Sequence, residues 1–93
     1  MHPLSKRVLT VSLENNKVIL TYQLGMADGI TIYGRRGQEA EFYPLAEDDP
    51  APFVDDRPKL NPDEPETRRY RAVLLYSDEE NRQLSEEVTV VVP

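Results

Sequence analysis

The chain has 93 residues and a mass of 10.7 kDa, which suits one compact domain and leaves no room for a second core. Its 17 acidic residues outnumber the 11 Lys and Arg, and a formal charge of -6 disfavours nucleic acid as a partner. The absence of cysteine excludes disulfides, thiolate zinc sites and a cysteine nucleophile.

Hydrophobic content indicates a chain that folds. Val, Ile, Leu and Phe make up 24 of the 93 residues, about a quarter, which is above the roughly one fifth below which disorder is expected. No apolar run approaches the roughly 20 residues needed to cross a bilayer, and no apolar stretch follows the basic residues near the start, as an export signal would require. We therefore expect one soluble domain over residues 1–93, with residues 1–6 flexible; the cellular location stays open.

The first 24 residues predict a hairpin of two strands. Apolar residues recur at every second position over 9–13 and again over 18–24, as expected of half-buried strands. Between them, Asn15 and Asn16 tolerate the positive φ angles of a tight turn.

The middle of the chain predicts two shorter strands and a long loop. Ile30–Tyr33 is rich in β-branched and aromatic residues, and Gly34–Gly37 is expected to turn the chain. A short or edge strand then begins at Phe42 and stops near Pro44, which lacks a backbone donor. Six of the eight prolines lie between residues 44 and 65, so this region is expected to be loop, interrupted by a strand fragment at residues 53–54.

The last third contains the strongest strand. Over residues 67–76, Tyr70, Ala72, Leu74 and Tyr76 share one parity. A polar turn is expected at residues 77–81 and a final strand at 88–92. Seven short strands with turns every 8 to 12 residues predict an all-β fold of two antiparallel sheets packed as an immunoglobulin-like sandwich. The expected core is Leu9, Val11, Leu20, Tyr22, Ile30, Ile32, Leu60, Ala72, Leu74, Val88 and Val90.

Four segments carry a resemblance to a known family: Phe53–Asp56, Leu60–Pro62, Tyr70–Leu74 and Leu84–Val90. In these segments the chain resembles the fibronectin type III domain. The resemblance implies that family's strand topology and a role in a modular assembly. It also implies that Tyr70 is the structural tyrosine of the corner, with its hydroxyl bonded back to the preceding loop. Tyr22 stands where the family usually has tryptophan.

Residue types leave little room for catalysis or for a cofactor. His2 is the only histidine and lies at the end of the chain, so neither a nucleophilic triad nor a usual zinc site can be assembled. We expect no enzymatic activity, no cofactor and no metal. The acidic groups at 47–49, 55–56 and 63–64 leave calcium open as an alternative, although their spacing matches no calcium loop. Solvated surface is the favoured interpretation, with Asp55 bracing a turn.

Two further groups of side chains were weighed for binding. Tyr33 and Tyr43 are candidates for stacking on a carbohydrate. A small accessory module that binds either calcium or carbohydrate is therefore the alternative function. The arginines form the main concentration of positive charge, and pairing with carboxylates across strands is favoured over phosphate binding. They are Arg35, Arg36, Arg68, Arg69 and Arg71.

Outward positions of the sheet suggest a protein contact. If Tyr70 and Leu74 face the core, Val73 and Leu75 face outward, and Tyr33 and Val91 lie on the same surface. Such an apolar strip is typical of contact with another domain, another copy or a protein partner, unless arginine side chains cover it. We therefore expect a non-catalytic structural or protein-interaction module, with a homodimer among the possible assemblies.

Overall fold

The computed structural model describes residues 8–25, 27–48, 50–76 and 81–93, with the side chains of residues 81–83 left aside. All regular structure in this part of the chain is β-strand. The predicted all-β, two-sheet antiparallel sandwich is confirmed. The strands are β1 (Leu9–Glu14), β2 (Lys17–Tyr22), β3 (Gly29–Arg36), β4 (Tyr43–Glu47), β5 (Phe53–Asp55), β6 (Glu66–Tyr76), β7 (Asn81–Leu84) and β8 (Val88–Val92).

The smaller sheet has the order β1-β2-β5. Strands β1 and β2 form the predicted hairpin, with Leu9 opposite Tyr22 and Glu14 opposite Lys17. Asn15 and Asn16 both have positive φ, at 51° and 65°, as a tight hairpin turn with matching twist requires. Because β5 pairs with the other side of β2, the residues around Asp55 lie beside the hairpin.

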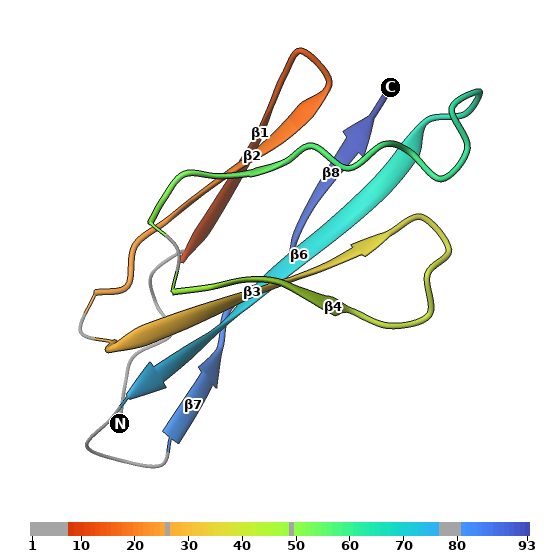
Figure 1. Ribbon diagram of the computed structural model, residues 1–93. Helices are drawn as coiled ribbons and strands as arrows, with labels where there is room; N and C mark the ends of the chain where they lie inside the picture. The colour runs from red at the N-terminus through yellow and green to blue at the C-terminus, as the bar shows by residue number, and fades with distance from the viewer. Residues whose placement is uncertain (1–7, 26, 49, 77–80) are drawn as a thin grey trace.

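The larger sheet has the order β4-β3-β6-β7, and β8 pairs with the same strand β6. Strand β7 pairs with one half of β6 and β8 with the other half, so the two follow each other along one edge (Figure 1). Between them, Ser85 binds Ala72 twice: its amide donates to the Ala72 carbonyl and its hydroxyl accepts from the Ala72 amide, both at 2.8 Å. Strand β7 was not predicted, since only one final strand, at residues 88–92, was expected from the sequence.

Two predicted boundaries in the middle of the chain were wrong. Strand β3 continues through Gly34 to Arg36, and the turn comes at Gly37, whose φ is 50°. A Cβ at Gly34 would lie 2.6 Å from Leu45 Cδ1 and 3.1 Å from the Tyr70 ring, so this glycine gives the ring room. Strand β4 does not stop at Pro44 but passes through it, because β4 is an edge strand and Pro44 adjoins a register shift.

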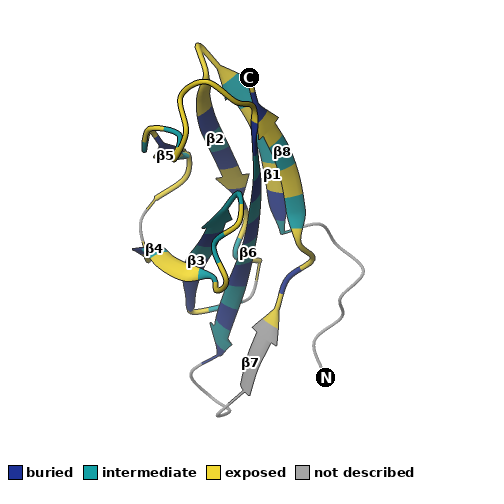
Figure 2. Cartoon of the chain, turned by 90° about the vertical axis from the view of Figure 1, so that its right-hand side faces the viewer, coloured by how far each residue is buried: buried dark blue, intermediate teal, exposed yellow. Residues whose placement is uncertain are grey.

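The core lies between the two sheets. Along β6 every even-numbered residue is buried and every odd-numbered one is partly exposed, a pattern visible as alternating colours in Figure 2. Of the expected core residues, seven are buried: Leu9, Leu20, Tyr22, Ile30, Ile32, Ala72 and Leu74. Three are half-buried and pack against that core: Val11, Val88 and Val90.

Leu60 is a correction, because its side chain is 55% exposed. It belongs to the loop between β5 and β6, and its backbone amide is held by Glu66. Beneath this loop, the space that an apolar side chain would fill is occupied by charged groups, as described below.

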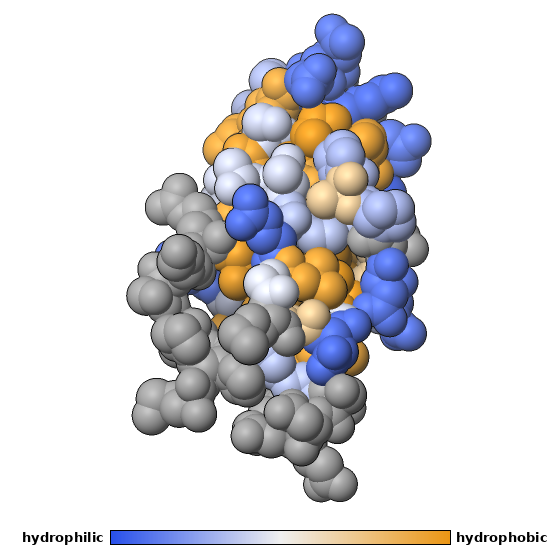
Figure 3. All heavy atoms as spheres, turned by 90° about the vertical axis from the view of Figure 1, so that its left-hand side faces the viewer, coloured by the Kyte–Doolittle hydropathy of each residue, from blue (hydrophilic) through white to orange (hydrophobic). Residues whose placement is uncertain are grey.

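The molecule is elongated, with principal extents of 47, 25 and 21 Å. On the face seen from the left of Figure 1, apolar groups are broken up by polar ones (Figure 3). On the outward side of the smaller sheet, Ile19 is partly exposed and its partner Val54 is exposed. Among the described residues, no helix is long and apolar enough to span a membrane.

Candidate functional site

A buried tyrosine joins the two sheets. Tyr70 on β6 is fully buried, and its hydroxyl donates a hydrogen bond of 2.6 Å to Asp55 Oδ2 at the end of β5. The resemblance had implied a bond to the loop just before Tyr70. The bond described here instead reaches a side chain 15 residues earlier, at the point where that loop begins. Tyr70 therefore fixes the start of the loop and holds β5 against β6.

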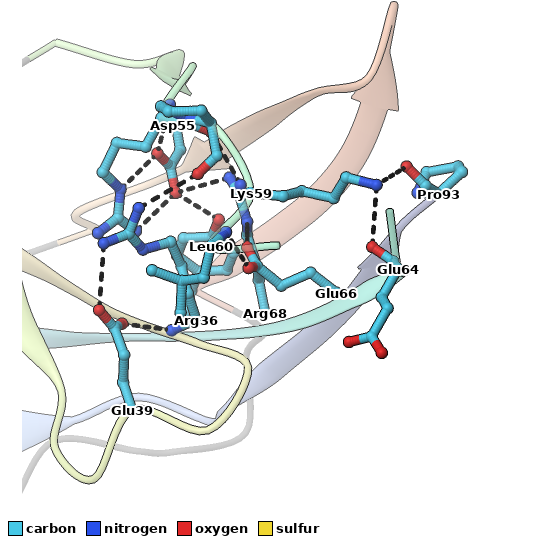
Figure 4. A network of polar contacts seen from close by, with 12 residues as sticks. Arg36, Glu39, Asp55, Lys59, Leu60, Glu64, Glu66, Arg68 and Pro93 are labelled. Carbon is cyan, nitrogen blue, oxygen red and sulfur yellow. Dashed lines mark hydrogen bonds and ion pairs between the residues drawn. The ribbon is translucent and has the colours of Figure 1, made fainter. Parts of the chain in front are cut away.

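Asp55 is the centre of an ionic network (Figure 4). It accepts hydrogen bonds of 2.8 Å from Arg57 Nε and from Arg57 Nη2, and one of 3.2 Å from the Arg57 amide. The last bond is local, as expected of an aspartate that braces a turn, but the expectation of solvated surface is wrong for Asp55, which is buried. Both carboxylate oxygens are bonded, which compensates the burial of this charge.

Arg68 is the second buried charge of the network. Its side chain is 1% exposed; Nε donates to Glu66 Oε2 at 2.7 Å and Nη2 donates to the Arg57 carbonyl at 2.8 Å. The remaining nitrogen, Nη1, lies 3.4 Å from Asp55 Oδ2 as an ion pair without a hydrogen bond. Since Glu66 also accepts from the Leu60 amide at 2.8 Å, both halves of the loop are held over Arg68.

Arg68 is paired with carboxylates, as the sequence analysis favoured, but it is buried. Arg68 has the same parity as Tyr70, so its side chain points inward at the end of the sandwich. Asp55 and Glu66 supply the opposite charges there. Sequence parity was the available signal, but it could not show that two carboxylates from different segments meet this guanidinium.

Further polar contacts surround the network and hold the neighbouring loops (Figure 4). Arg36 binds Glu39 through its amide at 2.6 Å and through Nη2 at 3.1 Å, and its Nη1 donates to the Pro58 carbonyl at 3.2 Å. Lys59 Nζ donates to the backbone oxygens of Glu64 and Pro93, at 2.9 and 2.8 Å. The turn after β3, the loop and the end of β8 are thus tied together.

Electrostatics fix the protonation states at the centre of the network. Burial by itself would raise the pKa of Asp55, but the hydrogen bonds from Arg57 and Tyr70 and the Arg57 charge outweigh it and hold the pKa below the ordinary value. Burial and the bond to Asp55 raise the pKa of Tyr70 far above its ordinary value. Neither group is poised to exchange a proton near neutral pH, as a general acid or base would need to be. The network therefore serves the architecture.

The outer face of the larger sheet carries the predicted apolar strip only in part. Tyr33, Val73 and Leu75 point outward and are half-buried, on neighbouring rungs of β3 and β6. Leu84 on β7, which the sequence analysis did not include, lies opposite Val73 and is 50% exposed. Val91 is 51% exposed but pairs with residue 67 at the far end of β6. We call Tyr33, Val73, Leu75 and Leu84 the outer strip.

Arginine stems were the competing explanation for this surface. Arg71, the residue of β6 nearest to the strip, places its guanidinium over the Phe42 ring, 4.0 Å from the ring centre. A cation at this distance is attracted by the aromatic face. To reach Phe42 beside β4, the Arg71 stem crosses β3 at the position of its direct partner Tyr33, so the arginine explanation applies at the Tyr33 end of the outer strip.

The alternative ligand sites receive no support from the geometry. The register pairs Tyr43 with Gly34, one residue beyond Tyr33, so the two tyrosines project from opposite faces of the sheet and do not form one stacking surface. No three acidic or histidine side chains of the described residues gather where they could hold a metal ion. Asp48 instead accepts the Ile30 amide at 2.9 Å. His2 and Asp49, like the predicted flexible residues 1–6 and most of the turn at 77–81, lie outside the described residues.

Comparisons of the chain with family models, with curated proteins and with solved structures found no match.

Proposed function

We propose that the chain is a non-catalytic protein-interaction module of the fibronectin type III kind, acting as a spacer or binding domain of a larger assembly. Three features support the proposal: the three-stranded sheet packed on a larger one, the last strand divided into β7 and β8, and the buried tyrosine near the start of β6. Asp55 and Tyr70 are the pair of ionizable groups most like a catalytic acid and base. They are hydrogen-bonded to each other and unsuited to proton transfer.

The observation that carries the proposal is the outer strip. A sheet face exposed to water is usually polar, yet here four apolar side chains from β3, β6 and β7 lie side by side. Contiguous apolar surface of this kind marks contact sites. The strip therefore indicates the surface that the module presents.

Charge on the same face favours a particular kind of partner. Arg35, Arg69 and Arg71 point outward from the same two strands, although the whole chain is acidic. Two copies packed face to face through this surface would bring arginines towards arginines, which opposes association. A neighbouring domain or separate protein with an apolar patch bordered by carboxylates fits the face better.

Replacing Val73 and Leu75 together by threonine tests the strip. Threonine keeps the β-branched shape of valine and preserves strand propensity, so the fold should persist while affinity for a captured partner falls at least about tenfold, as expected when central apolar contacts are lost. Affinity purification from the source cell followed by titration of the captured protein measures this change.

Val54→Thr is the matched control, because Val54 is also exposed but lies on the opposite sheet. It should leave the affinity unchanged. Equal binding by the double variant and the wild type would contradict the proposal, and so would turnover in a screen of hydrolase substrates without any protein partner.

A further inference from the structure

A hollow of about 530 Å³ opens beyond the basic end of the outer face, where the turn after β3 meets the loop before β6. Arg35 and Arg69 line it, together with the side chains of Gln38, Asn61 and Thr67. Its volume lies within the range of small-molecule sites. Its position is distinct from the outer strip, none of whose residues line it.

Two like charges face each other in this hollow. Arg35 and Arg69 are direct partners in the β3–β6 register, an arrangement that destabilises a sheet when nothing compensates it. On the next rung, Arg36 and Arg68 are also partners, but each has a carboxylate within hydrogen-bond distance. The carboxylates that compensate the charges of Arg36 and Arg68 therefore have weak or missing counterparts at Arg35 and Arg69.

The two facing arginines have unused donors. Arg35 makes no side-chain hydrogen bond or ion pair with the described residues, and its Nε is buried without a partner. Arg69 has one ion pair, to Glu87 at 3.7 Å, between side chains that are both about 40% exposed; such pairs contribute little. The terminal nitrogens of the Arg35 guanidinium likewise have no acceptor among the described residues, and they are the donors that an anion in the hollow would engage.

Carboxylates at the hollow do not supply the missing partner. Glu66 lines it, but both of its oxygens already accept bonds, from Leu60 and Arg68. Glu64 also lines it, and among the described residues its carboxylate forms no ion pair with Arg35 or Arg69. Its charge weakens the attraction of the hollow for anions without cancelling the pair of arginines.

We propose that Arg35 and Arg69 form a subsite for the phosphate group of a small ligand, with Gln38, Asn61 and Thr67 as further donors. Guanidinium forks match the geometry of phosphate oxygens. Two forks with neighbouring amide and hydroxyl groups offer more donors than a single carboxylate can accept. The subsite uses none of the residues of the outer strip, although Arg35 and Arg69 also contribute to the charge of the outer face.

Titration with inorganic phosphate and with phenyl phosphate, at constant ionic strength set with chloride, tests the subsite. Amide NMR shifts should change saturably at residues 35–38, 60–61 and 67–69. Arg35→Gln and Arg69→Gln should each weaken binding at least about tenfold, because each removes charge-assisted hydrogen bonds. Glu64→Gln should strengthen it.

Arg71→Gln is the matched control, since it makes the same change of charge on the same strand but outside the hollow. It should weaken binding less than either of the other two substitutions, because it removes a neighbouring charge but no hydrogen bond to the anion. Equal weakening by Arg71→Gln would show non-specific attraction and overturn the proposal. Absence of saturable shifts, or acetate binding as tightly as phosphate, would overturn it too.

Folding of the variants does not limit the test. Arg35→Gln removes one of two repelling charges and should fold at least as stably as the wild type. Should it nevertheless fail to fold, Arg35→Lys keeps the charge but loses the planar fork. This variant should still weaken phosphate binding, and unchanged affinity would count against the subsite.

Discussion

Asp55→Ala should lower the free energy of unfolding by about 3–5 kcal/mol, the cost of breaking a buried ion pair from one side. The substitution leaves the Arg68 guanidinium buried with one fewer counter-charge and the Tyr70 hydroxyl without its acceptor. It also releases Arg57, which anchors the start of the loop. Urea denaturation followed by circular dichroism measures the loss.

Asp56→Ala is the control for this variant. The neighbouring Asp56 is exposed, so its removal should change stability by no more than about 0.5 kcal/mol. Should Asp55→Ala be unfolded under all conditions, Tyr70→Phe removes only one donor and should still cost about 1–3 kcal/mol by leaving Asp55 less well bonded. Equal stability of the Asp55 and Asp56 variants would show that the network contributes nothing.

Leu20→Ala should destabilise the protein by about 2–5 kcal/mol, because it opens a cavity between the sheets. Leu20 is fully buried and lies in the middle of β2, opposite Val11 and Phe53. Thermal or chemical denaturation of the purified variant gives the value.

The same substitution at an exposed leucine provides the control. Leu60→Ala should change stability by no more than about 0.5 kcal/mol, since more than half of that side chain already contacts solvent. A large loss at Leu60 with a small loss at Leu20 would contradict the location of the core between the two sheets.

Local patterns were sufficient for most strands. The alternation over Leu9–Leu13 and over Tyr70–Tyr76 reports which residues face a core, and the structure confirms it. Asn15 and Asn16 likewise mark the hairpin, because their side chains tolerate the backbone that the turn requires. These properties depend on residues that are close in the sequence, so the sequence alone is sufficient to predict them.

Features that depend on distant segments could not be predicted in this way. Strand β7 lacks an apolar alternation and forms because β6 is long enough to pair with it. The burial of Arg68 depends on Asp55, 13 positions earlier, and the exposure of Leu60 follows from that network. The outer strip was predicted in part because its residues share a parity, but Leu84 could join it only once β7 was known.

Three charged side chains lie close to the core and contact one another. The charged groups nearest the core, Asp55, Glu66 and Arg68, stabilise one another and fasten the loop before β6. The proposed function therefore depends on side chains outside this network, namely those of the outer strip.

A carbon-detected NMR titration of the Asp55 carboxyl group tests the central claim most directly. A pKa held below the ordinary value by Arg57 and Tyr70 means that the stability due to Asp55 is present above the ordinary carboxyl pKa and is lost as the pH falls through the folded value. We predict that the pKa of Asp55 lies below the ordinary value of an aspartate side chain, with unfolding becoming easier over the same acidic range. A pKa at or above that value would contradict the account, because Asp55 would then be a carboxyl group free to exchange its proton.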